Sequence, residues 1–179
     1  MMMIINNLFL IGLMGAGKTT LGKRLAKRLN FEFCDSDAWI VENCGKSIAR
    51  IFAESGEAAF RQIESQALKT LCQQKNLLLA TGGGAPLLKE NQVCLKNNGF
   101  VVYLHATPKT LAARIANDNT RPLLQVENPL KKLELLYAVR HSIYTSTAHF
   151  VLNIDDLSLE SAQHCIINAY ENFQSQNSA

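Results

Sequence analysis

The residues with the clearest chemical potential lie in the stretch GLMGAGKTT, residues 12–20. They match the spacing Gly-x-x-x-x-Gly-Lys-Thr, in which the glycines let backbone N–H groups turn inward around a phosphate. The apolar run NLFLIG precedes this motif and a helix-like segment follows it, which is the context that the pattern requires. The sequence therefore predicts a phosphate-binding loop for a nucleotide, a P-loop.

Two side chains of this loop have specific tasks toward a nucleotide. We expect Lys18 to reach the β- and γ-phosphate oxygens and the hydroxyl of Thr19 to bind Mg²⁺. The predicted nucleotide-binding residues of the loop are Gly12, Gly15, Ala16, Gly17, Lys18, Thr19 and Thr20. A tight glycine turn with an incidental lysine is the alternative, and the flanking strand and helix argue against it.

Two carboxylates, Asp35 and Asp37, follow the next apolar stretch in FEFCDSD. The run NLLLAT ends in threonine, so the metal needs a second ligand from elsewhere. We expect Asp35 to bind the metal and Asp37 to face a substrate, because alternate positions leaving a strand point the same way. The alternative is that Asp35 only ends the strand and Asp37 caps the next helix.

Three arginines, Arg61, Arg121 and Arg140, are candidates for holding a small anionic acceptor. Guanidinium groups bind carboxylates and phosphates in a planar, paired geometry. Taken alone, Arg61 is more often a solvated helix residue, here paired with Glu64, and Arg140 a similar surface residue. Their occurrence together with a P-loop favours substrate binding.

The elements that must position these residues alternate along the chain. Apolar strands are expected at residues 8–11, 31–35, 76–81, 100–105 and 149–154, with helices between them. Strands that are continuously apolar indicate a five-stranded parallel sheet covered by helices on both faces, a three-layer α/β/α fold. Ligands of such sheets bind at the carboxyl ends of the strands, where the motifs above mostly lie.

Composition narrows the class of protein. With 179 residues, 47% of them hydrophobic and 18% charged, the chain is expected to form one soluble domain, frayed only at residues 174–179. A net charge of +3, carried by scattered basic residues, does not predict a nucleic-acid partner. No apolar run approaches the roughly 18 residues that span a membrane. The five cysteines form no C-x-x-C pair and suit a reducing cytoplasm.

Several motifs together resemble the shikimate kinase family across nearly the whole chain. They are GLMGAGKTT, FCDSDAWI, GKSIARIFAESGEAAFRQIE, ATGGGAP, NTRPLL and RHSIY, in family order and at family-like spacing. The resemblance implies a single kinase domain like the nucleoside-monophosphate kinases, with a mobile lid at residues 117–128 and acceptor-binding helices at residues 37–64. It also implies Mg²⁺-dependent transfer of the γ-phosphate of ATP to the 3-hydroxyl of shikimate, in chorismate and aromatic amino-acid biosynthesis. We expect the protein to be a cytoplasmic monomer.

The resemblance further implies an acceptor site. Its residues are Asp37, Arg61, Gly82, Gly83, Gly84 and Arg140. Asp37 would contact the ring hydroxyls and take the proton, the two arginines would hold the carboxylate, and the glycine backbone would lie against the ring. Glu64 would orient Arg61 from one turn away, and Phe52 and Phe60 would form apolar walls.

The nucleotide side of the site is implied in the same way. Arg114 would stack on adenine, and Arg121, in the lid, would bring a cation to the transferring phosphoryl group as closure expels water. The catalytic residues would then be Lys18, Asp37 and Arg121. The sequence departs from the family at Val41, where the family usually carries glutamate.

Two other functions stay open on the sequence. A related kinase would act on gluconate or a nucleoside monophosphate, and the pair of acceptor arginines with the motifs DSD and GGG argues against it. A regulatory domain would bind nucleotide without catalysis, and the intact set of catalytic and metal-binding residues argues against it.

Overall fold

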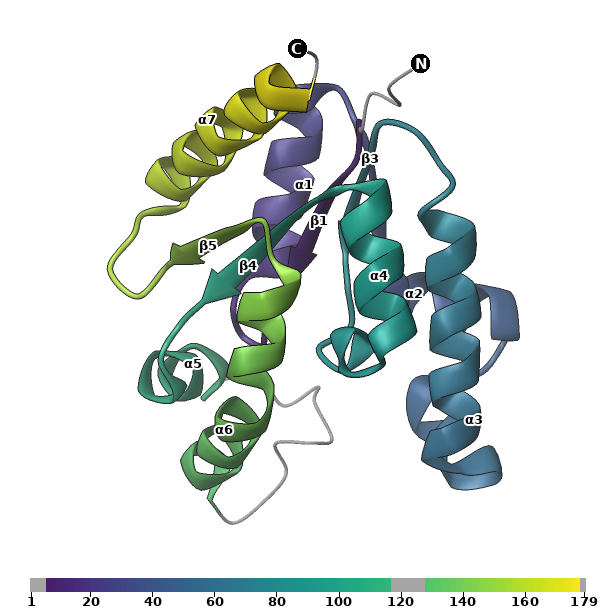
Figure 1. Ribbon diagram of the computed structural model, residues 1–179. Coiled ribbons are helices and arrows are strands. Elements are labelled where there is room, and N and C mark those ends of the chain that lie inside the picture. Colours follow the sequence, from purple (N-terminus) through teal and green to yellow (C-terminus); the bar gives the residue numbers. More distant parts are fainter. Residues whose placement is uncertain (1–5, 117–127, 178–179) are drawn as a thin grey trace.

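A five-stranded parallel sheet forms the centre of the structure, a computed structural model that describes residues 6–116 and 128–177 (Figure 1). The strand order is β2-β3-β1-β4-β5. The strands are β1 (Leu8–Ile11), β2 (Glu32–Asp35), β3 (Leu77–Ala80), β4 (Phe100–His105) and β5 (Phe150–Asn153). Helices cover both faces of this sheet, which confirms the predicted fold class.

The helices alternate with the strands along the chain, as the sequence predicted. They are α1 (Lys18–Leu29), α2 (Ser36–Cys44), α3 (Ile48–Leu71), α4 (Lys89–Asn98), α5 (Pro108–Ile115), α6 (Pro129–Thr147) and α7 (Leu159–Asn177), with a short 3₁₀ helix, η1 (Ala85–Leu87), before α4. In Figure 1, α1 and α7 cover one face of the sheet, while α4 and α6 cover the other. None of the helices within the described ranges is long and apolar enough to cross a membrane.

The end of α7 corrects one expectation. The helix continues through Asn177 and so includes residues 174–177, where the sequence predicted fraying. Polar side chains of this last turn bond back to the helix: Ser175 Oγ donates to the Glu171 carbonyl at 2.9 Å, and Asn177 Nδ2 donates to the Phe173 carbonyl at 2.7 Å. These bonds supply a local stabilisation that the polar composition alone does not reveal.

The core is densest around the central strand. Every residue of β1 is fully buried, and Leu10 pairs with Ala80 of β3 on one side and Val102 of β4 on the other. Burying one leucine side chain contributes about 1.5–3 kcal/mol, so these continuous apolar runs strongly favour a strand covered on both faces. The three strands hold the loops at their carboxyl ends in a common frame.

The buried side chain of Asn7 fixes the opposite end of the same strands. Its Nδ2 donates to the carbonyls of Gln74, at 2.7 Å, and Asn98, at 3.1 Å. Its Oδ1 accepts from the backbone N–H of Leu77 at 3.0 Å. One amide group therefore joins the start of β1 to the start of β3 and the end of α4.

Helix α3 consists of two helical segments that meet at Gly56, whose φ of 81° and ψ of 173° are not helical. Ser47 caps the first segment, and the second begins at Glu57, after the break. The Ser47 hydroxyl accepts from the N–H of Arg50 at 3.2 Å. The second segment carries Arg61 and Glu64 toward the carboxyl ends of the strands.

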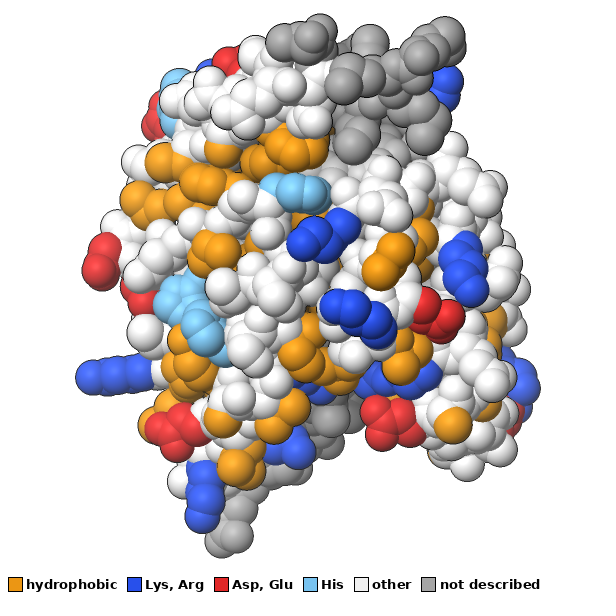
Figure 2. All heavy atoms as spheres, viewed as in Figure 1, with side chains coloured by type: hydrophobic (Ala, Val, Ile, Leu, Met, Phe, Trp, Pro, Cys, Tyr) orange, Lys and Arg blue, Asp and Glu red, His pale blue; other side chains and the backbone are white. Residues whose placement is uncertain are grey.

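The molecular surface of the face drawn in Figure 2 mixes side chains of different kinds. Among the described residues, Lys and Arg side chains there are scattered between acidic, hydrophobic and uncharged ones. No continuous basic surface forms on the described part of this face.

Candidate active site

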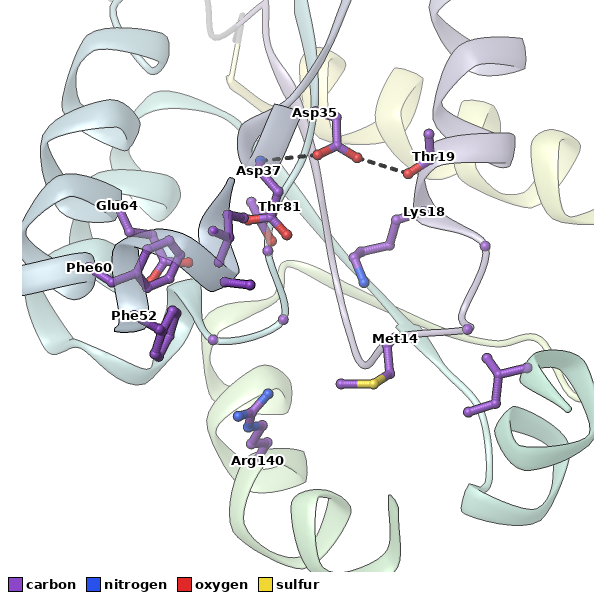
Figure 3. A pocket seen from close by; sticks show the side chains of 18 of the residues that line it. Met14, Lys18, Thr19, Asp35, Asp37, Phe52, Phe60, Glu64, Thr81 and Arg140 are labelled. Carbon is purple, nitrogen blue, oxygen red and sulfur yellow. Dashed lines mark hydrogen bonds between the residues drawn. The ribbon is translucent and has the colours of Figure 1, made fainter. Parts of the chain in front are cut away.

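A pocket of about 870 Å³ lies at the carboxyl ends of β1, β2 and β3 (Figure 3). It is lined by the P-loop, the β2–α2 junction, α3, the glycine loop after β3, and parts of α5 and α6. The structure brings together all the sequence-predicted site residues that it describes, except Gly12 and Ala16, which do not line the pocket. Arg121 lies outside the described residues.

The P-loop has the backbone that its motif predicts. Gly15 and Gly17 adopt positive φ angles of 80° and 85°. Lys18 Nζ donates to the carbonyls of Gly12, at 2.7 Å, and Leu13, at 3.0 Å, so the lysine lies across the loop. Gly12 therefore contributes a carbonyl that holds Lys18. Ala16 is buried beneath the loop.

Thr19 and Asp35 form the corner expected to bind a metal. Thr19 Oγ1 donates to Asp35 Oδ2 at 2.9 Å, and the other oxygen of Asp35 accepts from the N–H groups of Asp37, at 3.0 Å, and Ala38, at 3.3 Å (Figure 3). Asp35 is thus the N-cap of α2 as well as a neighbour of Thr19. A hydroxyl and a carboxylate oxygen are hard ligands that fit Mg²⁺.

Asp37 lines the pocket, as expected. The expectation that it would do so by the alternation of a strand was wrong. The strand ends at Asp35 and the helix begins at Ser36, so the two carboxylates do not follow the alternation of one strand. Asp37 instead enters the pocket from the first turn of α2, between the P-loop and α3 (Figure 3). Its helical position also excludes the alternative that it is the cap of α2.

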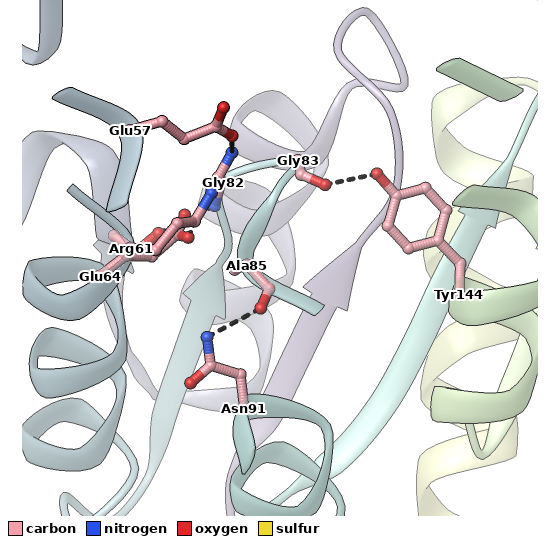
Figure 4. Close-up of polar contacts among 9 residues, drawn as sticks. Glu57, Arg61, Glu64, Gly82, Gly83, Ala85, Asn91 and Tyr144 are labelled. Carbon is pink, nitrogen blue, oxygen red and sulfur yellow. Dashed lines mark hydrogen bonds and ion pairs between the residues drawn. The ribbon is translucent and has the colours of Figure 1, made fainter. Parts of the chain in front are cut away.

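Arg61 lies at the other end of the pocket and contacts two glutamates. Its Nη1 donates to Glu64 at 2.7 Å, and its Nη2 donates to Glu57 at 3.1 Å (Figure 4). Glu64 is 1% exposed, whereas the Arg61 side chain is 18% exposed. The expected contact between Glu64 and Arg61 is therefore present, on the inner side of the guanidinium.

Burial is the largest influence on the Glu64 carboxyl group, and it raises the pKa of Glu64. The hydrogen bond and charge of Arg61 lower the pKa, while the charge of Asp37 raises it again. The net result is a pKa above the usual value of 4.5. Glu64 therefore depends strongly on Arg61 for its stabilisation as a carboxylate.

The glycine loop after β3 passes between these charged groups. A Cβ atom at Gly82 would lie 2.5 Å from a carboxylate oxygen of Asp37, and one at Gly84 would overlap the guanidinium of Arg61. A side chain at either position would displace Asp37 or Arg61 from its present place. The loop also meets α6, since Arg140 Nη1 is 3.5 Å from the place of a Cβ at Gly83.

Tyr144 ties the glycine loop to α6. The side chain is fully buried, and its hydroxyl donates to the Gly83 carbonyl at 2.5 Å (Figure 4). Burial raises the pKa of Tyr144, while the charge and a hydrogen bond of Arg140 lower it. On the β2 side, Ser36 Oγ accepts from the N–H of Gly82 at 2.9 Å. The loop is thus held from both sides.

The pocket also has apolar walls. Phe52 and Phe60 both line it, as expected, with their ring centroids 4.7 Å apart. Trp39 packs against the core instead of lining this pocket, and Val41 is exposed on α2. At the nucleotide end, Arg114 is anchored where its Nη2 donates to the Ile154 carbonyl at 2.8 Å.

Sequence reasoning missed three residues whose side chains hydrogen-bond to predicted site residues. Glu57 precedes Arg61 by four residues and Tyr144 follows Arg140 by four, so helical spacing provided a signal for both. Ser36 lies 46 residues before Gly82, its partner, and no local pattern predicts that contact.

Comparisons with known proteins point to one family. The family model described as shikimate kinase matches residues 14–170. A shikimate kinase of Burkholderia lata is 47% identical over 165 residues, covering 92% of this chain and 90% of the relative. One of Neisseria gonorrhoeae is 51% identical over 145 residues, covering 81% and 85%. The solved structure of Acinetobacter baumannii shikimate kinase in complex with shikimate superposes with a TM-score of 0.86 at 41% identity, covering 92% of each chain.

Proposed function

The chain belongs to the shikimate kinase family, and we propose that its pocket performs the reaction of that family with the residues described above. The enzyme transfers the γ-phosphate of ATP to the 3-hydroxyl of shikimate, giving shikimate 3-phosphate and ADP, a step of aromatic amino-acid biosynthesis. One observation carries this function: a single pocket joins a P-loop at one end to two arginines at the other.

The P-loop end is proposed to hold ATP. Its backbone N–H groups and the start of α1 surround the phosphates, and Lys18 leaves the loop carbonyls to contact the β- and γ-phosphate oxygens. Arg114 is proposed to lie against adenine, a role supported by its position on the pocket wall. We also propose that Arg121 delivers positive charge from a lid at residues 117–128, on the basis of the resemblance alone.

The other end is proposed to orient shikimate. Arg61 and Arg140 bind its carboxylate, and the backbone of the glycine loop lies against the ring. Asp37 accepts hydrogen bonds from the ring hydroxyls and takes the proton of the attacking 3-hydroxyl. Charged groups at both ends of a small rigid acid would fix a single orientation, which raises the rate of an in-line transfer.

Thr19 and Asp35 are proposed to hold Mg²⁺ together with phosphate oxygens of the nucleotide. Among the described residues, no group of three or more His, Cys, Asp and Glu side chains forms a metal site. Sharing of the ion with phosphates is the arrangement that Mg²⁺ commonly adopts in kinases. When bound, the ion neutralises charge on the transferring phosphoryl group.

We further propose a cytoplasmic monomer with a single kinase domain. The P-loop and both acceptor arginines line the same pocket of this chain. All five cysteines are free thiols, which suits a reducing compartment.

A coupled assay of ADP release tests the function, with shikimate, gluconate and nucleoside monophosphates as acceptors. We expect turnover with shikimate and loss of turnover in Lys18→Met and after chelation of Mg²⁺. Lys27→Met, which changes an exposed lysine of the same helix, is the matched control and should be active. Turnover with another acceptor only, or nucleotide binding without transfer, would contradict the proposal.

A further inference from the structure

The guanidinium of Arg61 contacts two carboxylates of its own helix. One belongs to Glu57, four residues earlier, and the other to Glu64, three residues later. Glu57 Oε1 lies 3.1 Å from Nη2, and Glu64 Oε2 lies 2.7 Å from Nη1 (Figure 4). If Arg61 binds the acceptor carboxylate, as in the proposed function on which this inference rests, three carboxylates compete for one cation. An acceptor carboxylate that approaches the Nη2 side of the guanidinium meets the contact that Glu57 already makes there.

The two glutamates differ in how easily they can leave Arg61. Glu64 is 1% exposed and lines the pocket, so its release would leave a buried carboxylate without its partner. Glu57 is 67% exposed and lies outside the pocket lining, immediately after the break in α3 at Gly56. Its release would return the carboxylate to water, and exposed ion pairs contribute little to stability.

We propose that Glu57 competes with the acceptor for Arg61 and thereby sets the affinity for the acceptor. The acceptor carboxylate takes the Nη2 side of the guanidinium, and Glu57 moves into solvent while Glu64 stays in place. The phosphorylated product keeps the same carboxylate, so the return of Glu57 to Arg61 also favours product release.

The sign of the change in acceptor affinity on removal of Glu57 distinguishes competition from a supporting role of this residue. Removing a residue that only supports Arg61 would weaken acceptor binding, whereas removing a competitor strengthens it. The exchange also replaces one ion pair with another, so salt should affect acceptor affinity of the unmodified protein only weakly. Without Glu57, binding creates an ion pair that was not there before, and its salt dependence becomes steeper.

Calorimetric titration of shikimate into Glu57→Gln and Glu57→Ala tests the proposal. The matched control is Glu54→Gln, because Glu54 lies on the other side of Gly56 and pairs with Lys46 and Arg50 outside the pocket, each at 2.6 Å. We expect both Glu57 variants to bind shikimate about two- to fivefold more tightly, in line with the strength of exposed ion pairs. They should also lose affinity more steeply than the unmodified protein as salt rises, and the control should do neither.

Several results would overturn the inference. Unchanged or weaker shikimate binding in both Glu57 variants would show that Glu57 does not compete. An equal gain in the Glu54 control would show that the effect is a general loss of negative charge. If the unmodified protein binds no shikimate, the proposed function fails and the inference fails with it. Normal binding by the unmodified protein makes the two failures distinguishable.

Discussion

Replacing Tyr144 by phenylalanine tests whether the contact between α6 and the glycine loop positions the acceptor site. The change removes one hydroxyl and leaves the buried ring, which packs on Tyr103, in place. The Gly83 carbonyl loses a donor at 2.5 Å, and Arg140 loses a hydrogen-bond partner. Two residues of the acceptor site are therefore loosened by the loss of a single atom that does not line the pocket.

The expected size follows from the burial of these groups. Leaving a buried acceptor without a donor costs about 1–3 kcal/mol, and Gly83 is only half-buried, so we expect the lower part of that range, about 1–2 kcal/mol. For a protein of this length the change lowers the melting temperature by roughly 2–8 °C. A comparable loss at Arg140 should raise the KM for shikimate about five- to thirtyfold and leave the KM for ATP within about twofold.

Thermal denaturation and steady-state kinetics with each substrate varied measure both effects. Tyr170→Phe is a matched control, because Tyr170 is also buried but its hydroxyl accepts from Gln174 on α7, away from the pocket. The control should keep the KM for shikimate, whatever its melting temperature. An unchanged KM for shikimate in Tyr144→Phe, or an equal rise of the KM for ATP, would refute the positioning role.

Two further predictions concern the Arg61–Glu64 pair. Arg61→Ala should weaken shikimate binding by about 2–5 kcal/mol in calorimetry and barely change ATP binding, because it leaves a desolvated carboxylate unpaired; equal losses would contradict the assignment. The raised pKa of Glu64 means that the folded state binds the proton of this carboxyl group more tightly than the unfolded chain does. The resulting contribution to the free energy of unfolding is fully present below pH 4.5 and is lost as the pH rises through the folded-state pKa. Glu64→Gln should remove that part of the pH dependence in denaturant titrations, and an unchanged profile would count against the buried-carboxylate account.

Much of the fold was predictable because its signals are local. The runs around Leu8, Leu77 and Phe100 are short and continuously apolar, which favours strands covered on both faces. The P-loop was predictable because its function depends on fixed spacing between glycines and Lys18. Gly56 divides α3 where the helical pattern of the sequence is interrupted.

The site was less predictable where contacts join distant segments. The pairing of Ser36 with Gly82 depends on how β2 and β3 align, and no periodicity encodes it. The direction of Asp37 depends on the residue at which β2 changes into α2, and sequence patterns locate such boundaries poorly. Helical spacing could have predicted the contact of Glu57 with Arg61. Whether Glu57 can leave Arg61 depends on its exposure to solvent, which only the folded chain defines.

The amide of Asn7 acts at a distance from the chemistry. It aligns the first central strand with its neighbour and with α4 at the rim of the sheet remote from the pocket. The same short strand leads directly into the P-loop, so a shift at its beginning displaces the nucleotide cradle along the strand axis. Substitution of Asn7 would therefore change the alignment of the catalytic groups. A search for inactivating substitutions should include the edge of the sheet that lies opposite the pocket.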